Sequence, residues 1–210
     1  MKMLTCLLFL FASFSSVATD DECSPLTTPL SLDQRQQLTG TRNFISGYSD
    51  HDVYNAILKI TQSSVMTFNE STFNDKDVFV YEEMKMNGTC YGTKLNISVD
   101  HNLASAIMGT ISSTMHFLPT CEGCQVLSIN STARDLKTFL EAFQVYIPNN
   151  TNDEMKVRAL YLFASGDSVK DSDLEHFKKQ AQCLGFSGEP NFIFDPKEGS
   201  CAGSKIVMLN

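Results

Sequence analysis

The residues best suited to covalent or metal chemistry are the cysteines of the segment Cys121-Glu122-Gly123-Cys124. A C-x-x-C spacing is typical of thiol redox catalysts and of zinc sites. A zinc site needs a second such pair or two histidines, which the sequence does not place to complete it, and a redox pair is expected where a helix begins in a βαβ unit. We therefore predict a local disulfide that tightens a turn, with free or redox-active thiols as the alternatives, and expect no metal and no cofactor.

Two glutamates, Glu82 and Glu141, lie within segments rich in aromatic and β-branched residues, and Glu141 is in phase with Phe139 and Phe143. A carboxylate that points into a protein interior is costly unless a cation accompanies it. Such an acid either pairs with a basic residue such as Arg42 or awaits a cationic ligand, for example an amine, a guanidinium or an organotin species. Neighbouring aromatic rings would add cation-π attraction. A one-residue shift in register would instead turn Glu141 to solvent and bring Leu140 inward.

The elements that must position these acids are short runs rich in β-branched and aromatic residues, separated by polar or glycine-containing breaks. Several alternate with period two and are apolar on one face and mixed on the other, which is typical of a barrel around a ligand cavity. We predict eight strands, over residues 38–49, 56–68, 77–86, 89–99, 104–117, 124–130, 138–147 and 157–164.

The pattern changes after Gly166, where residues 172–181 carry acids early, lysines later and apolar residues at helical spacing. We predict one amphipathic helix there, ended by Gly185, and a short closing strand over residues 191–194. No internal repeat or low-complexity linker divides the chain, so a single domain is expected.

The N-terminus has the charged, apolar and small-residue order of a secretory signal peptide, with Met1-Lys2, an apolar run over residues 4–14 and Ala18. We place cleavage after Ala18, which leaves residues 19–210 as the mature domain and predicts a secreted, extracellular protein. The apolar run is shorter than the ~20 residues of a bilayer span, so no membrane span is expected. The mature part keeps an even number of cysteines, which suits three disulfides.

Charge and glycosylation acceptors agree with this compartment. A formal net charge of −8 has the wrong sign for neutralising phosphates, so nucleic acid is not an expected partner. Five Asn-X-Ser/Thr acceptors predict N-linked glycans at exposed positions, namely Asn69, Asn87, Asn96, Asn130 and Asn149.

Local segments carry a resemblance over nearly the whole mature chain, from Cys23 to Cys201. They are Leu32-Asp33-Gln34, Leu38-Thr39-Gly40-Thr41-Arg42-Asn43-Phe44-Ile45, Val53-Tyr54-Asn55, Gly88-Thr89-Cys90, His116-Phe117, Ala142-Phe143 and Gln182-Cys183-Leu184. These segments resemble the orosomucoid (alpha-1-acid glycoprotein) branch of the lipocalins, and the chain is similar to the saxitoxin- and tetrodotoxin-binding and tributyltin-binding lipocalins.

The resemblance implies an all-β fold, an eight-stranded antiparallel up-and-down lipocalin barrel with one C-terminal α-helix and a short closing strand. It also implies that Cys23 pairs with Cys183 and Cys90 with Cys201. One position departs from the lipocalin pattern, because Arg42 occupies the place of a tryptophan that packs across the closed end of the barrel, and the chain has no tryptophan. Either the barrel floor closes differently or Arg42 stacks on aromatic rings.

By the same resemblance, the function is that of a carrier that binds small hydrophobic or cationic organic ligands, including toxins or xenobiotics, without turnover. Two alternatives remain: an immunomodulatory glycoprotein that acts through its surface, and an isomerase with a reactive cysteine in the barrel. Transferred strand by strand, the inward residues are Phe44, Tyr48, Met66, Phe68, Val80, Glu82, Ile111, Phe139, Glu141, Phe143, Tyr161 and Phe163, with Tyr54 at the rim.

Overall fold

The computed structural model describes residues 20–33, 38–71, 77–145 and 154–209. The expected signal peptide over residues 1–18 lies outside this part of the chain, and so does Asn149. The elements follow in chain order: α1 (Asp20–Thr27), β1 (Gly40–Ser49), α2 (Asp52–Ile60), β2 (Thr61–Glu70), β3 (Asp77–Met86), β4 (Thr89–Asp100), β5 (Leu103–Met108), β6 (Ile111–Leu118), β7 (Cys124–Ala133), α3 (Lys137–Ala142), β8 (Met155–Ala164), α4 (Asp171–Cys183), β9 (Phe192–Ile193), the 3-10 turn η2 (Pro196–Glu198) and β10 (Ile206–Met208).

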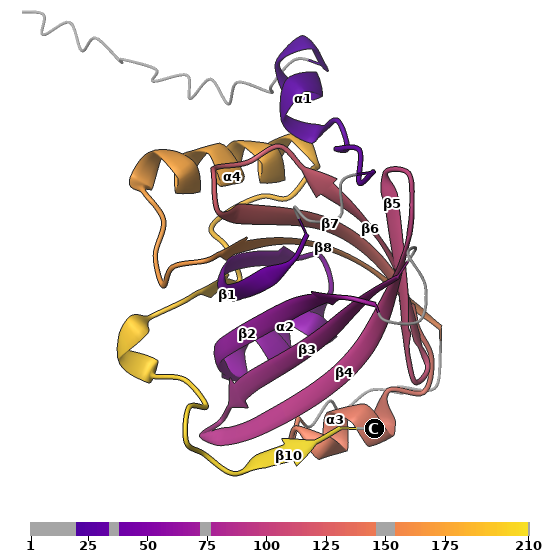
Figure 1. Cartoon of the computed structure of the whole chain (residues 1–210), viewed down its shortest axis with the longest axis vertical. Coiled ribbons are helices and arrows are strands. Elements are labelled where there is room, and N and C mark those ends of the chain that lie inside the picture. Colours follow the sequence, from indigo (N-terminus) through magenta and orange to yellow (C-terminus); the bar gives the residue numbers. More distant parts are fainter. Residues whose placement is uncertain (1–19, 34–37, 72–76, 146–153, 210) are drawn as a thin grey trace, which may run out of the picture.

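Strands β1 to β8 close into an antiparallel barrel (Figure 1). The hydrogen-bonded order runs β4-β3-β2-β1-β8-β7-β6-β5, and β5 pairs back with β4. Two short strands extend the barrel: β9 pairs with β1, and β10 lies parallel to the first residues of β4. The eight-stranded antiparallel barrel, the C-terminal helix and the short closing strand expected from the sequence are therefore all present.

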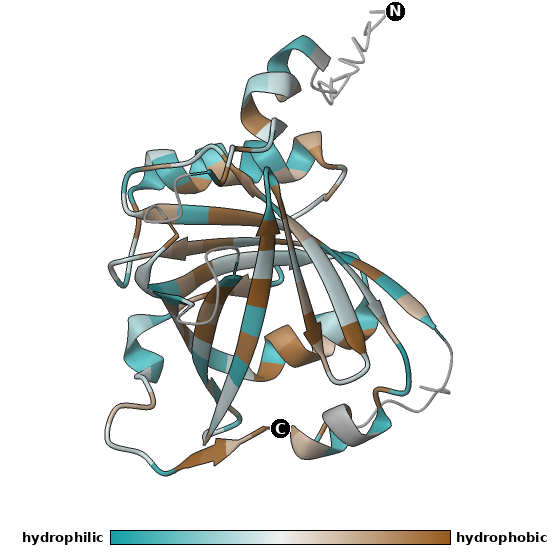
Figure 2. Cartoon of the chain, turned by 45° about the vertical axis from the view of Figure 1, so that its right-hand side comes forward, coloured by the Kyte–Doolittle hydropathy of each residue, from teal (hydrophilic) through white to brown (hydrophobic). Residues whose placement is uncertain are grey.

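Alternation along the strands produces one core inside the barrel and a second core outside it. Buried Phe68, Val80 and Phe163 belong to the inner cluster, whereas Leu160 and Leu162 of the same wall belong to the outer one. Figure 2 shows apolar residues along the barrel strands and hydrophilic residues prominent on α1 and α4. Because β8 is apolar on both faces, it needs a covering element outside the barrel as well as a filled interior.

Helix α4 provides that cover. Its buried Phe177 and Ala181 join the outer cluster against β1 and β8. The helix extends slightly beyond the predicted residues 172–181, and Gly185 follows it at φ +82°, a left-handed conformation that ends a helix readily. Of the helices in the described part of the chain, none combines the length and apolar character that crossing a membrane requires.

Two predicted strands are divided in the structure. The run at residues 56–68 splits into the end of α2 and the start of β2, and the run at residues 104–117 splits into β5 and β6. Gly109 makes the turn between β5 and β6 at φ +57°. A period-two pattern does not report a hairpin inside a run when the turn is this short.

The strand predicted over residues 138–147 is wrong, because Lys137–Ala142 form α3. Residues 146 and 147 lie outside the described part of the chain. Leu136, Leu140 and Phe143 are buried and recur at helical spacing, while Glu141 is exposed. Strand β7 pairs directly with β8, so the barrel closes without this segment. The short apolar run fitted both periods, and the closed sheet left only the helix available.

The described part of the chain contains three disulfides, and they are the expected pairs. Cys23–Cys183 ties α1 to the end of α4, and Cys90–Cys201 ties β4 to the C-terminal tail. Cys121–Cys124 closes the turn that leads into β7. Among the described residues no group of three or more histidine, cysteine or acidic side chains is arranged to hold a metal ion.

Candidate ligand-binding site

One inner wall of the barrel is aromatic. The Phe44 ring lies 5.0 Å from that of Tyr161 and 5.2 Å from that of Phe163, measured between centroids. Phe192 of β9 stacks on Phe44 at 4.4 Å with an interplanar angle of 7°. The structure thus brings Phe44, Tyr161 and Phe163 together on the inner face, as expected. Phe192 was missed, although its place in the closing strand and its ring type were visible in the sequence.

A polar wall carries Glu82. Register pairs Glu82 of β3 with Met66 of β2 on one side and with Thr93 of β4 on the other. The buried Ser64 hydroxyl donates a hydrogen bond to Glu82 Oε1 at 2.7 Å. Burial raises the pKa of Glu82, and the bond from Ser64 offsets only part of that effect. The inward position predicted for Glu82 is therefore the one observed, while Ser64 and Thr93 were not among the predicted residues.

No basic side chain accompanies Glu82 among the described residues, since its hydrogen-bond partner there is Ser64. The hydroxyl of Tyr161 lies in the same surroundings, and burial, with smaller contributions from Tyr54 and Glu82, raises the pKa of Tyr161 above its usual range. An uncompensated carboxyl and a neutral phenol inside a barrel form a site that favours a cation.

Several side chains on the inner face of the barrel are only partly buried. Glu82 and Tyr161 lie deep enough among protein atoms for burial to raise their pKa values, yet both side chains retain some accessible surface. Met66 and Leu95, which pack against the inner core, are also only partly buried. Since the strands point these side chains inward, their accessible surface faces the inside of the barrel. The interior is therefore not a fully packed core at this level.

Leucines and the Arg42 side chain lie at the floor of the barrel. Leu32 and Leu38 from the segment before β1 are buried in the inner cluster. Arg42 donates hydrogen bonds to the backbone oxygens of Thr39 and Thr41 at 3.3 and 3.5 Å, and burial lowers the pKa of Arg42. Across the described residues, neither an ion pair nor an aromatic ring engages Arg42. Of the two expectations for Arg42, the structure agrees with the first: the floor closes without a stacked Arg42, through buried leucines and through hydrogen bonds from Arg42 to backbone oxygens.

The opposite end of the barrel, the mouth, is covered by α2 and α3. Ile111 is buried there with Leu140 of α3, and Tyr54 of α2 packs against the same cluster. Burial raises the pKa of Tyr54, and the nearby Ser131 side chain offsets part of that effect. Phe143 meets the Tyr91 ring edge-on at 5.0 Å. Tyr54 and Ile111 thus lie at the mouth, and Phe143 reaches it from the end of a helix instead of from a strand.

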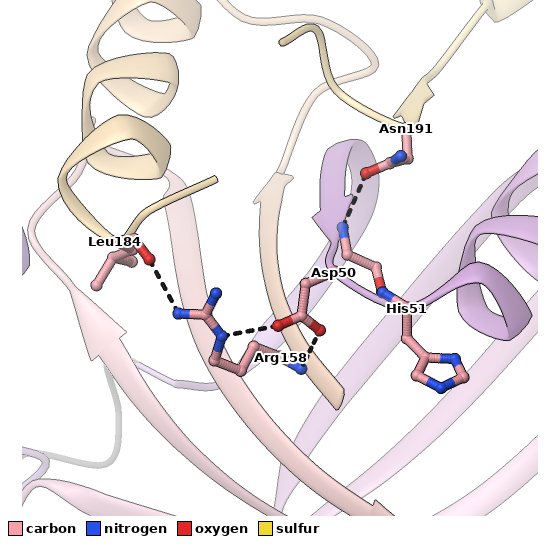
Figure 3. Close-up of polar contacts among 6 residues, drawn as sticks. Asp50, His51, Arg158, Leu184 and Asn191 are labelled. Atoms are coloured by element: carbon pink, nitrogen blue, oxygen red, sulfur yellow. Dashed lines mark hydrogen bonds and ion pairs between the residues drawn. The ribbon is translucent and has the colours of Figure 1, made fainter. Parts of the chain in front are cut away.

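A polar cluster of Asp50 and Arg158 links the segment between β1 and α2 to the end of α4 (Figure 3). The Arg158 backbone N–H and Nε donate to the two carboxylate oxygens of Asp50 at 2.8 and 2.7 Å, and Nη1 donates to the Leu184 oxygen at 3.1 Å. The guanidinium also lies 5.3 Å from the centroid of the Phe186 ring. Desolvation opposes ionisation of Asp50, but the hydrogen bonds and charge of Arg158 outweigh it and lower the pKa of Asp50.

A neighbouring set of hydrogen bonds determines where α2 begins. The Ser49 N–H donates to Asn191 Oδ1 at 2.9 Å, and the His51 N–H donates to Ser49 Oγ at 3.3 Å. His51 is the N-cap of α2, and its Nδ1 accepts the Val53 N–H at 3.2 Å. The helix that covers the mouth therefore starts from a position fixed by the segment after α4.

Two predicted lining residues are not on the inner face. A bulge in β1 between Phe44 and Ser46 reverses the alternation, so Tyr48 faces outward and packs on Phe177 of α4 at 5.7 Å between ring centroids. Glu141 is exposed on α3, where it pairs with Lys137 at 3.9 Å. Both expectations assumed an unbroken strand alternation. The register alternative considered for Glu141 predicted the observed exposure of Glu141 and burial of Leu140, but the cause is the helix α3 and not a shifted strand register.

The remaining predicted residues divide into inner-wall positions and glycan acceptors. Phe68 and Val80 are buried in the inner cluster, and Met66 packs against it. Phe139 belongs to α3, not to a strand. Four acceptor asparagines are exposed, namely Asn69, Asn87, Asn96 and Asn130.

The closed barrel, its C-terminal helix and its enclosed interior define the lipocalin fold. The structure superposes on the siderocalin Ex-FABP, described as functioning through dual ligand specificities, with a TM-score of 0.56 at 10% identity, over 76% of this chain and 95% of that chain. A second siderocalin, described as having a dual ligand binding mode, gives 0.53 at 9% identity over 74% and 87%. A bovine lipocalin allergen gives 0.51 at 12% identity over 74% and 90%. No family model and no curated protein matches the sequence.

Proposed function

We propose that this protein is a secreted glycoprotein that binds and carries small lipophilic or cationic organic molecules inside its barrel, without turnover. The observation that carries the proposal is the enclosed Glu82 carboxyl, which has a serine hydroxyl beside it and no cation among the described residues. A cationic guest would supply the missing charge, and the aromatic wall would contact its apolar part.

Further support comes from the fold and from the cysteines. Two of the similar structures are siderocalins described by their dual ligand binding, which suits a binding role for this barrel. The Cys23–Cys183 and Cys90–Cys201 pairs are those that the resemblance to the orosomucoid branch implies. We therefore include membership of that branch in the proposal. Every cysteine of the described residues is in a disulfide, so none is a free nucleophile for an isomerase.

The test is competitive displacement of a fluorescent hydrophobic probe from the mature glycoprotein by matched pairs of ligands. Each pair consists of an organic amine or guanidinium compound and a neutral analogue of the same size. We expect the cationic member to bind at least about tenfold more tightly, since loss of one charge-assisted contact is worth roughly 1.5–3 kcal/mol. Fatty acids, steroids and organotins complete the panel.

Glu82→Gln is the decisive variant, and Glu141→Gln is its matched control because that carboxyl is exposed. The first change should abolish the preference for cations while leaving neutral ligands bound. The second should change neither. Equal affinity for both members of each pair in the unmodified protein would contradict the cation site, and failure of any probe to bind would contradict the carrier function itself.

A further inference from the structure

The Cys121–Cys124 disulfide lies in a surface groove of about 690 Å³ on the outside of the barrel. Both cysteines line the groove, together with residues 164–166 at the end of β8 and residues 168–170 before α4. Both are only partly buried. The groove therefore gives a molecule from solvent a path to the disulfide, although Cys124 also packs against the outer core cluster.

The other two disulfides are placed differently. Cys90 and Cys201 are 5% and 4% exposed, so their sulfurs are shielded. Cys23–Cys183 is partly buried between α1 and α4, but it joins residues 160 positions apart. Cys121–Cys124 spans only 3 positions, and a small loop constrains the unfolded chain far less than a large one. Opening this disulfide therefore costs the fold least.

The turn around the disulfide is also held without it. The Ser165 N–H and hydroxyl both donate to the Gly123 oxygen, at 2.9 and 3.2 Å. Cys124 is the first residue of β7 and is paired with Ala164 of β8. These contacts do not involve the sulfur atoms, so they would persist in the dithiol form.

The two sulfurs are not equivalent. The Thr120 hydroxyl donates a hydrogen bond to Cys121 Sγ at 3.8 Å. A hydroxyl donor stabilises a thiolate, which makes Cys121 the better leaving group and Cys124 the sulfur that an incoming thiolate attacks.

We propose that Cys121–Cys124 is an exchangeable disulfide that a dithiol, either a small molecule or a protein dithiol, reduces while the barrel and the other two disulfides stay intact. One thiolate of the dithiol attacks Cys124 Sγ, the S–S bond breaks, and Cys121 leaves as a thiolate that takes up a proton. The second thiol of the dithiol, after losing its proton, displaces Cys124. The partner ends as a disulfide and the protein gains two thiols, a transfer of two electrons and two protons.

The test is timed reduction of the mature, folded glycoprotein with dithiothreitol, followed by alkylation and peptide mass mapping, with far-ultraviolet circular dichroism recorded in parallel. We expect Cys121 and Cys124 to be alkylated at least about tenfold faster than the other four cysteines, with an unchanged spectrum. Simultaneous appearance of all thiols, earlier appearance of Cys23 and Cys183, or appearance only on unfolding would each overturn the proposal.

Two variants sharpen the test. Thr120→Val keeps the shape of the side chain but removes the hydroxyl, so it should slow the fast phase several-fold and leave the slow phase unchanged. With a limiting monothiol, the trapped mixed disulfide should be on Cys124. A fast phase unaffected by Thr120→Val, together with trapping on Cys121, would refute the assigned direction of attack. The double change Cys121→Ser with Cys124→Ser should remove the fast phase alone, and persistence of that phase would refute the site.

Discussion

The two walls inside the barrel differ in what stabilises them. The wall made by β1, β8 and β9 carries Phe163 and Phe192, whose rings both contact that of Phe44. The wall made by β2 and β3 carries Ser64 and Glu82, whose carboxyl is enclosed without a cation among the described residues. Packed rings stabilise the empty protein, whereas an enclosed acid destabilises it. The contrast indicates that the first wall contributes more to the stability of the fold than the second does.

The largest effect that we expect is on the aromatic wall. Phe163 is 1% exposed and touches Phe44, so Phe163→Ala should lower the free energy of unfolding by about 3–5 kcal/mol through lost contacts and a residual cavity. Urea unfolding followed by circular dichroism measures this. Ile193→Ala, at a side chain that is 56% exposed, is the control and should leave the transition in place. A loss below about 1 kcal/mol would mean that this wall is not structural.

The polar wall should respond in the opposite direction. Glu82→Gln should raise the free energy of unfolding by roughly 1–3 kcal/mol near neutral pH, because it removes the desolvation cost of a buried acid. The folded-state pKa of Glu82 is raised, so the unmodified protein should be most stable below the ordinary pKa of the carboxyl and should lose stability as pH rises through the raised pKa. Glu82→Gln should flatten this slope in unfolding curves recorded across pH. A destabilised variant with an unchanged slope would contradict the assignment.

Ser64→Ala should have a smaller effect on the same wall. It removes the hydrogen bond to Glu82, which contributes about 1 kcal/mol, and so should raise the pKa of Glu82 further. As the pH is lowered, Glu82 takes up a proton and no longer attracts a permanently charged cation. In Ser64→Ala this loss of affinity should therefore begin at a higher pH than in the unmodified protein. Probe displacement across pH measures the shift. An unmoved profile would show that Ser64 does not set this ionisation.

The smallest effect is expected at Tyr48, which tests the boundary between the inner and outer cores. Tyr48→Phe keeps the contact with Phe177 and removes only a long hydrogen bond to the Gly188 oxygen at 3.4 Å. Ligand affinity should not change, and stability should fall by no more than about 1 kcal/mol. A changed ligand preference would mean that Tyr48 reaches the interior.

Glu82 and Glu141 show how far period-two reasoning extends. Glu82 lies in β3, which has the bounds that the sequence predicted and pairs continuously with β4, so unbroken alternation preserves the inward direction that the family resemblance implied. Glu141 lies in a segment that suited either period, and it became exposed once that segment formed α3. Alternation is informative only where the strand exists.

Side-chain periodicity and composition by themselves predicted most of the barrel strands, the position of α4 and the local Cys121–Cys124 pairing, because these depend on residues close together in the chain; the number of strands in the barrel was expected from the family resemblance. The two long-range disulfides were expected from family resemblance. Tertiary structure alone decided that a bulge turns Tyr48 outward, that residues 137–142 form a helix, and that Arg42 bonds to backbone oxygens instead of to an acid. Each of these depends on which distant segments come into contact when the sheet closes, and a local pattern of residue types does not specify those contacts.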